Sequence, residues 1–246
     1  MELKEKGSSA QVGEFDQLKV DLSWTSAVDL DLMAFYKTED GQTGGVYSEN
    51  YSGGSLGNLN RFPHIQLSGD EGVGASGGRN VETMRITTLE EIDELYICAL
   101  NFTAASKSNQ TSFANYDAEV EVHTDRGENM TVPLQSSQAG TVAVIAKFTS
   151  SFMGSELVND NEVMSFDAFK SQVPGAEELE LSSKVTLKSK GDSFELKSKA
   201  GSGDEFLINL NWSQRGRRAI DLDLGALYDL HEDRIPSGGF LDKLTG

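Results

Sequence analysis

The sequence contains one cysteine, few basic residues and no long apolar segment. The cysteine, Cys98, cannot form a disulfide within the chain, so we expect a buried thiol in a reducing compartment. No stretch approaches the roughly 20 apolar residues that a membrane-spanning helix needs. The opening residues, MELKEKG, also lack the apolar centre of a signal peptide. These features predict a soluble, cytoplasmic protein.

Basic residues are outnumbered, with 21 lysines and arginines against 39 aspartates and glutamates and a net charge of −18. A chain this acidic lacks the positive surface that neutralises phosphates, so nucleic acid is excluded as the expected partner. Residues 184–246 contain ten basic and ten acidic residues, which places the whole acidic excess in residues 1–183. Such a region either binds divalent cations or simply keeps the protein soluble.

Histidine is also scarce, and the few copies form no familiar catalytic arrangement. His64, His123 and His231 belong to no Ser/His/Asp frame and to no histidine-rich metal motif. The glycine-rich stretch is not closed by the Lys-Ser/Thr pair of a phosphate-binding loop. Paired carboxylates can act as the acid and base of a glycosidase, but two aspartates on one strand fit metal chelation better. We therefore expect a protein that is not an enzyme, with a hydrolase as the least favoured alternative.

The chain is organised around a tetrapeptide of alternating aspartate and leucine that occurs twice, as Asp29–Leu32 and as Asp221–Leu224. Each copy follows a short run that ends at a tryptophan, Trp24 or Trp212. Each copy also precedes a short stretch of small and apolar residues that ends at a tyrosine. In a strand, both leucines of a copy point to one face and both aspartates to the other. The leucines are then expected to enter the core.

The two aspartates of each copy are expected about 7 Å apart at the backbone, because a strand rises roughly 3.3 Å per residue. Like charges held this close repel each other unless a cation lies between them. An edge strand with a solvated polar face is the alternative interpretation. The repetition of the whole frame, from tryptophan to tyrosine, favours a metal site.

Glycine is concentrated between Tyr51 and Gly78, in a long loop that is interrupted by a short predicted strand, His64–Leu67. Loops of this length are usually functional or disordered. Within it, Leu67–Gly74 (LSGDEGVG) resembles a metal-binding loop, because glycines allow positive φ and carboxylates supply charge. Calcium accepts six to eight oxygen ligands of this mixed kind. The spacing is not that of an EF-hand.

Strand-like alternation recurs through residues 15–150, where about eight predicted strands are separated by turns. This pattern predicts an all-β fold, a β-sandwich rather than a parallel α/β sheet. The predicted boundaries are a sandwich over residues 15–160, a helix and linker over 161–183, and an incomplete second β module over 184–246. The helix is expected to end at Pro174.

The order of these features resembles the TerD-type tellurium-resistance family, and most closely its TerA branch. The resemblance is carried by Asp29–Tyr36, by residues 53–60 (GGSLGNLN) and by Gln66–Gly74. It covers residues 15–150 and, as the front half of a second copy, residues 184–230. It implies a cytoplasmic, calcium-binding β-sandwich that acts in resistance to tellurite and other stresses.

By position, Asp29, Asp31, Asp70 and Glu82 match the acidic metal-binding motifs of the family. Its second acidic cluster is represented here by residues 78–82 (GRNVE), in which an arginine and an asparagine reduce the negative charge. One metal site is therefore expected, and an adjacent second site is disfavoured. The candidate metal ligands are Asp29, Asp31, Asp70, Glu71, Asn80, Glu82, Asp221 and Asp223.

We expect a Ca2+-binding module or scaffold protein of a bacterial tellurite-resistance and stress-response system. The resemblance implies partners among other Ter-type proteins or a second chain, and a peripheral association with the inner face of the membrane. The alternative is a module that uses bound calcium to grip an acidic ligand, such as a lipid head group or a sugar.

Overall fold

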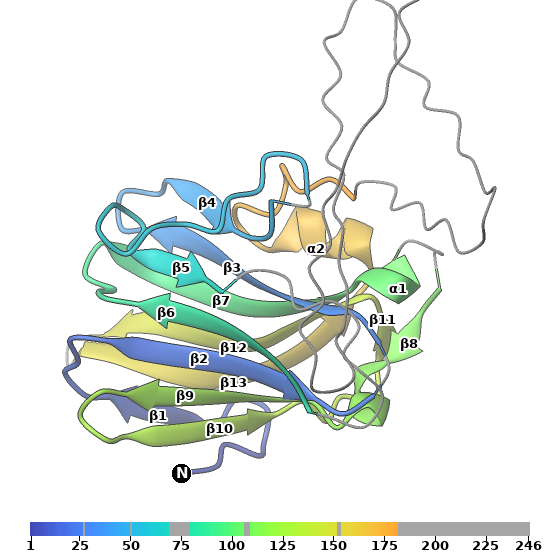
Figure 1. The fold of residues 1–246 in the computed structure, drawn as a ribbon, viewed down its shortest axis with the longest axis horizontal. Coiled ribbons are helices and arrows are strands. Elements are labelled where there is room, and N and C mark those ends of the chain that lie inside the picture. Colours follow the sequence, from blue (N-terminus) through green and yellow to red (C-terminus); the bar gives the residue numbers. More distant parts are fainter. Residues whose placement is uncertain (27, 50, 69–78, 106–108, 152–153, 182–246) are drawn as a thin grey trace, which may run out of the picture. The chain divides into compact units, whose positions relative to one another are not determined.

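Two antiparallel sheets lie face to face in the computed structural model, which describes residues 1–181 apart from 27, 50, 69–78, 106–108 and 152–153 (Figure 1). The chain divides into two units, residues 1–198 and 199–246, and every described residue belongs to the first. The predicted all-β sandwich is confirmed. The predicted second module over 184–246, with Asp221 and Asp223, lies outside the described residues.

The larger sheet has six strands in the order β1-β13-β12-β7-β3-β4. These strands are Ser9–Val12 (β1), Gly154–Met164 (β13), Val142–Ser151 (β12), Ile92–Asn101 (β7), Leu30–Thr38 (β3) and Thr43–Val46 (β4). The smaller sheet has the order β10-β9-β2-β6-β5. Its strands are Asn129–Pro133 (β10), Glu119–Thr124 (β9), Leu18–Trp24 (β2), Asn80–Ile86 (β6) and Ile65–Leu67 (β5). The remaining elements are a ribbon of Thr111–Ser112 (β8) and Ala139–Gly140 (β11), the helices Phe102–Ala105 (α1) and Phe166–Gln172 (α2), and the 3-10 turn Phe113–Tyr116 (η1).

The space between the two sheets is filled by apolar side chains from both of them. Leu22 and Trp24 of β2 share one buried cluster with Leu30 and Leu32 of β3. All four side chains are buried because strand alternation directs them to the inner face of their sheets. The prediction that both leucines of the first Asp-Leu-Asp-Leu copy enter the core is therefore confirmed.

The outer face of the six-stranded sheet carries a second buried cluster. Met33 and Phe35 of β3 pack there with Cys98 of β7 and with Phe169 of α2. The rings of Phe35 and Phe169 meet edge to face, with centroids 5.2 Å apart. The central strands β3 and β7 are thus buried on both faces, which explains their almost continuous apolar sequence. Burial raises the pKa of the Cys98 thiol well above its usual range, and the expected buried cysteine is confirmed.

Helix α2 forms where the sequence predicts it. The hydroxyl of Ser165 caps its first turn by accepting a hydrogen bond from the backbone N–H of Ala168 at 3.2 Å. The helix ends at Gln172, because Pro174 cannot continue the helical hydrogen bonds and restricts the residue before it. None of the helices in residues 1–181, as far as they are described, is long and apolar enough to cross a membrane.

The sandwich begins earlier than the predicted start at residue 15, and its last strand passes the predicted end at residue 160. The backbone of Thr131 in β10 exchanges hydrogen bonds with Met1 and Leu3, at 2.9 and 2.8 Å. Strand β1 then pairs with β13, which runs on to Met164. The N-terminal residues therefore lie beside β10 and β1 and connect the edges of both sheets (Figure 1). Strand β1 is short and weakly apolar, so its role depends on a partner that is distant in the sequence.

We expect Asn159→Ala to lower the free energy of unfolding by about 1–3 kcal/mol. The Asn159 side chain is fully buried and donates to the carbonyl of Leu3 at 2.7 Å, while it accepts from Asn161 at 3.0 Å. The variant leaves both partners without this bond in the interior. Gln11→Ala, on the exposed side of β1, is the control and should change stability by less than about 0.5 kcal/mol. Urea unfolding measures both, and equal losses would contradict the role of Asn159.

A second prediction concerns Asp160, a half-buried carboxyl on β13. Burial first, and then the charge of Glu162, raise its pKa, against the lowering influence of Lys147 and Lys6. The ionised form is therefore disfavoured in the folded state. This penalty in the free energy of unfolding is absent below the unfolded pKa of about 3.9, and it is complete once the pH exceeds the folded pKa. Asp160→Asn should stabilise the protein at pH 7, and the gain should shrink toward pH 4. A gain in the urea midpoint that is the same at both pH values would contradict this assignment.

Candidate metal centre

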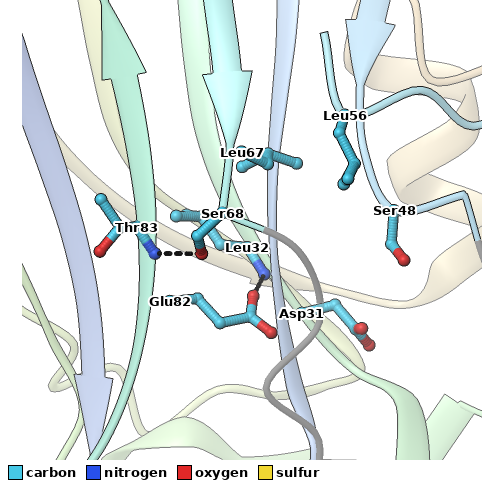
Figure 2. A pocket seen from close by; sticks show the side chains of 8 residues that line it. All are labelled: Asp31, Leu32, Ser48, Leu56, Leu67, Ser68, Glu82 and Thr83. Atoms are coloured by element: carbon cyan, nitrogen blue, oxygen red, sulfur yellow. Dashed lines mark hydrogen bonds between the residues drawn. The ribbon is translucent and has the colours of Figure 1, made fainter.

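A small cavity lies where the two sheets meet, between the first residues of β3 and the first residues of β6. Its volume is about 10 Å3, close to the minimum that accommodates one water molecule or one ion. Figure 2 shows the side chains around it, with the carboxylates of Asp31 and Glu82 on opposite strands. The lining residues are Asp31, Leu32, Ser48, Leu56, Leu67, Ser68, Glu82 and Thr83.

Asp31 comes from the second position of β3, and its side chain is buried although it carries a carboxylate. Its oxygen Oδ2 accepts a hydrogen bond of 2.6 Å from the hydroxyl of Tyr51. Tyr51 belongs to the outer cluster and meets Phe102 edge to face. The aspartate face of β3 is therefore covered by aromatic side chains, and the alternative of an edge strand with a solvated polar face is wrong.

Glu82 comes from β6 in the other sheet, and it is buried as well. Its oxygen Oε2 accepts the backbone N–H of Leu32 at 2.5 Å (Figure 2). Strand β4 pairs with β3 only from Ala34 onward, so on that side the start of β3 has no neighbouring strand among the residues that the structure describes. The Glu82 carboxylate accepts a backbone N–H of β3 that has no partner strand there, and this hydrogen bond links the two sheets.

Asp29 is also buried, in the turn that connects β2 to β3. The turn is held by the indole of Trp24, whose Nε1 donates to the carbonyl of Val28 at 2.9 Å. The carbonyl of Asp29 itself accepts from the N–H of Phe102 at 3.1 Å. The tryptophan that precedes each Asp-Leu-Asp-Leu copy thus fixes, in the first copy, the backbone from which the aspartates project.

The residues that replace the expected second acidic cluster have structural partners. Arg79 donates to the hydroxyl of Ser23 at 2.6 Å and forms an ion pair with Glu119. Asn80 opens β6 opposite Trp24 and does not line the cavity. These contacts place Arg79 and Asn80 at the five-stranded sheet, and a single metal site stays a prediction.

Among the predicted ligands, the structure brings Asp31 and Glu82 to one cavity and buries Asp29 nearby in the sequence. Asp70, Glu71, Asp221 and Asp223 lie outside the described residues. Within the part of the chain that is described, no three or more aspartate, glutamate, histidine or cysteine side chains form a group that could hold a metal ion. Sequence reasoning missed Tyr51, Ser48 and Ser68, because single hydroxyl groups at the ends of glycine-rich segments give no recognisable motif.

The described lining offers the type of ligand atom that calcium prefers, but fewer ligands than calcium needs. Asp31 and Glu82 offer carboxylate oxygens, and Ser48 and Ser68 offer hydroxyl oxygens. All are hard ligands of the type that calcium prefers over the softer ligands of zinc or copper. Calcium takes six to eight oxygens, so further ligands from backbone, water or the segment after Ser68 are required.

We expect Tyr51→Phe to lower the free energy of unfolding by about 1.5–3 kcal/mol, the range for a hydrogen bond to a charged group. The variant removes only the hydroxyl that lies 2.6 Å from Asp31. Tyr47→Phe is the matched control, because Tyr47 is equally buried in the same cluster and its hydroxyl donates to no described residue. Thermal or urea unfolding compares the two variants. A loss in Tyr47→Phe as large as that in Tyr51→Phe would show that the contact with Asp31 is not special.

Among known proteins, only solved structures show a similarity to this chain. No protein-family model matches the chain, and no curated protein sequence matches it. A solved structure of a homologue of telluride resistance protein TerD, from Streptomyces coelicolor A3(2), is similar with a TM-score of 0.42 and 18% identity, over 59% of this chain and 88% of that chain. A protein of unknown function is similar with a TM-score of 0.45 and 12% identity, over 63% of this chain and 94% of that chain. Both TM-scores are below 0.5, so neither structure carries an inference about this protein.

Proposed function

We propose that this chain is a calcium-binding module of the TerD type, closest to the TerA branch, and that it acts as a binding or scaffold protein rather than as an enzyme. One observation carries the proposal. The carboxylates of Asp31 and Glu82, from two different sheets, line a single cavity with room for one ion. The sequence resemblance in Asp29–Tyr36 and Gln66–Gly74 supports the same assignment.

Burial makes a cation a suitable occupant of this cavity. Two carboxylates in a medium of low polarity repel each other more strongly than they do in water. A divalent cation between them removes that repulsion and replaces the lost hydration with ligand oxygens. The hydrogen bonds from Tyr51 and Leu32 hold the two carboxylates in place beside the cavity.

The remaining ligands are proposed to come from Asp70 and Glu71. The chain leaves Ser68, which lines the cavity, for the segment that contains both acids, and it returns to β6 shortly before Glu82. Asp29, which is buried just before β3, is a further candidate ligand. Asp221 and Asp223 are proposed to bind calcium only weakly, because two carboxylates supply few of the six to eight oxygens that calcium takes.

A role in binding, not catalysis, is supported by the residue types at the cavity. Its described lining contains no histidine, cysteine or lysine that could act as a general base or nucleophile beside the carboxylates. A cation at this point would link β3 to β6 and so stiffen the junction of the two sheets. We propose that the calcium-loaded module presents a surface to other Ter-type proteins or to a second chain in a tellurite-resistance and stress-response system.

The proposal predicts that calcium raises the melting temperature of the full-length chain relative to chelator. A ligand that binds only the folded state adds about 2.7 kcal/mol at a hundredfold excess over its Kd. Asp31→Asn should remove most of this gain, and so should the double variant Asp70→Asn/Glu71→Gln. Glu90→Gln, an exposed acidic residue in the turn before β7, is the control and should keep the full gain.

Isothermal titration with calcium and magnesium measures the affinity directly, and circular dichroism checks that each variant is folded. A melting temperature that is identical in chelator and in excess calcium would end the metal assignment. Unchanged calcium affinity in Asp31→Asn would show that the metal binds elsewhere. Loss in Asp31→Asn with full binding in the double variant would keep the cavity but reject Asp70 and Glu71 as ligands.

A further inference from the structure

A second concave site lies along β4, on the side of the molecule where the six-stranded sheet ends. Its volume is about 530 Å3, within the range of roughly 300–1,000 Å3 that is typical of ligand sites. We call it the β4 groove. Its lining residues are Tyr36, Thr43, Gly44, Gly45, Tyr47, Ser52, Gly53, Gly175, Glu177, Glu178 and Glu180. None of them belongs to the cavity of Asp31 and Glu82.

The β4 groove contains a free sheet edge. Strand β4 is the last strand of the six-stranded sheet, and among the described residues it pairs only with β3 (Figure 1). Directly after β4, the N–H of Tyr47 donates to the carbonyl of Ser55 at 3.1 Å, so the free edge is limited to β4 itself. In an antiparallel pair every second residue directs its N–H and C=O groups away from the partner strand. Such groups at an edge accept another strand, which is how many extended peptides are bound.

Three glycines in the groove lining are closely packed against neighbouring atoms. A Cβ atom on Gly44 would lie 2.5 Å from the hydroxyl of Tyr36, and one on Gly45 would lie 2.7 Å from the ring of Phe35. A Cβ atom on Gly175 would lie 2.3 Å from the carbonyl oxygen of Gly44. Packing therefore requires glycine at all three positions. As a result, the backbone of Gly175 packs directly on that of Gly44, and neither Gly44 nor Gly45 adds a side chain at the groove.

The rim of the groove is acidic. Glu177, Glu178 and Glu180 are exposed, and none forms an ion pair with a described basic residue. The hydroxyl of Thr43 donates to Glu177 at 3.3 Å, which directs that carboxylate toward β4. The charge of Glu178 adds to burial in raising the pKa of Tyr47, which places Glu178 near that ring. The described lining includes no lysine, arginine or histidine.

We propose that the β4 groove binds an extended basic peptide, which adds as a strand to the free edge of β4 and places its arginine or lysine side chains against Glu177, Glu178 and Glu180. The edge supplies main-chain hydrogen bonds, and the carboxylates supply charge complementarity. The half-buried ring of Tyr36 suits stacking with a guanidinium group. A small polycation could form ion pairs with the carboxylates but no main-chain hydrogen bonds with β4. A basic peptide can form both, and we therefore favour the peptide.

The test is fluorescence anisotropy with the full-length chain and a labelled heptapeptide of alternating arginine and valine. The triple variant Glu177→Gln/Glu178→Gln/Glu180→Gln should weaken binding about tenfold, from the loss of three exposed ion pairs. The control triple variant Glu5→Gln/Glu90→Gln/Glu91→Gln removes the same charge from exposed positions outside the groove lining, and its Kd should stay within about twofold of the parent. Equal weakening in both variants would reduce the effect to general attraction by net charge and would overturn the proposal.

Two further probes separate strand addition from simple cation binding. The same heptapeptide with alternate backbone nitrogens methylated keeps its charges but loses half of its N–H donors, and it should bind at least tenfold more weakly. Spermidine, which has charge but no peptide backbone, should compete only weakly for the groove. Equal binding of the methylated peptide, or displacement of the parent peptide by equimolar spermidine, would overturn strand addition. Absence of any binding by the parent peptide would overturn the proposal as a whole.

Discussion

Burial of strand β3 on both of its faces is the constraint on which the rest of this structure depends. Its leucines fill the space between the sheets, while Met33 and Phe35 fill a second apolar layer outside. A strand that is buried on both faces needs other elements packed on each of them. On the outer face these elements are α2 and the segment that follows it. The same burial forces the polar groups of β3 to find partners inside the protein, because a buried group without a hydrogen bond is costly.

The partners of Asp31 and Leu32 follow from that requirement. Asp31 receives the hydroxyl of Tyr51, and the N–H of Leu32 is taken by Glu82 across the junction of the sheets. Each contact stabilises the fold, and together they bring two carboxylates to one small cavity. Fold stability and the proposed metal chemistry therefore rest on the same few residues, and a change in calcium binding has to be separated from a change in folding.

The acidic character of the protein is divided between two environments with different physics. At the cavity the carboxylates are buried and few, which suits a single desolvated divalent cation. Along the β4 groove they are exposed beside a free strand edge, which suits a chain that brings its own charges and hydrogen bonds. The cavity proposed for the cation lies at the start of β3, and β4 pairs with the later part of the same strand. The proposed metal and peptide sites thus share one structural support.

The sequence by itself determined the local features of the protein. Alternation in Asp29–Leu32 was enough to predict a strand with its leucines in the core, and the single cysteine was correctly expected to be buried. Pro174 marked the end of α2. These predictions succeeded because they depend on the alternation of side chains along a strand and on the backbone restriction at proline, which short stretches of chain encode.

Only the tertiary structure decided what covers each face and which distant groups meet. Alternation placed Asp31 opposite the core but could not show that Tyr51 and a helix would bury that face. Nor could it show that Glu82 would take the N–H of Leu32, that β1 would pair with β13, or that β4 would end a sheet beside Glu177. These contacts join residues far apart in the chain, and a pattern within one segment carries no information about which other segment will pack against it.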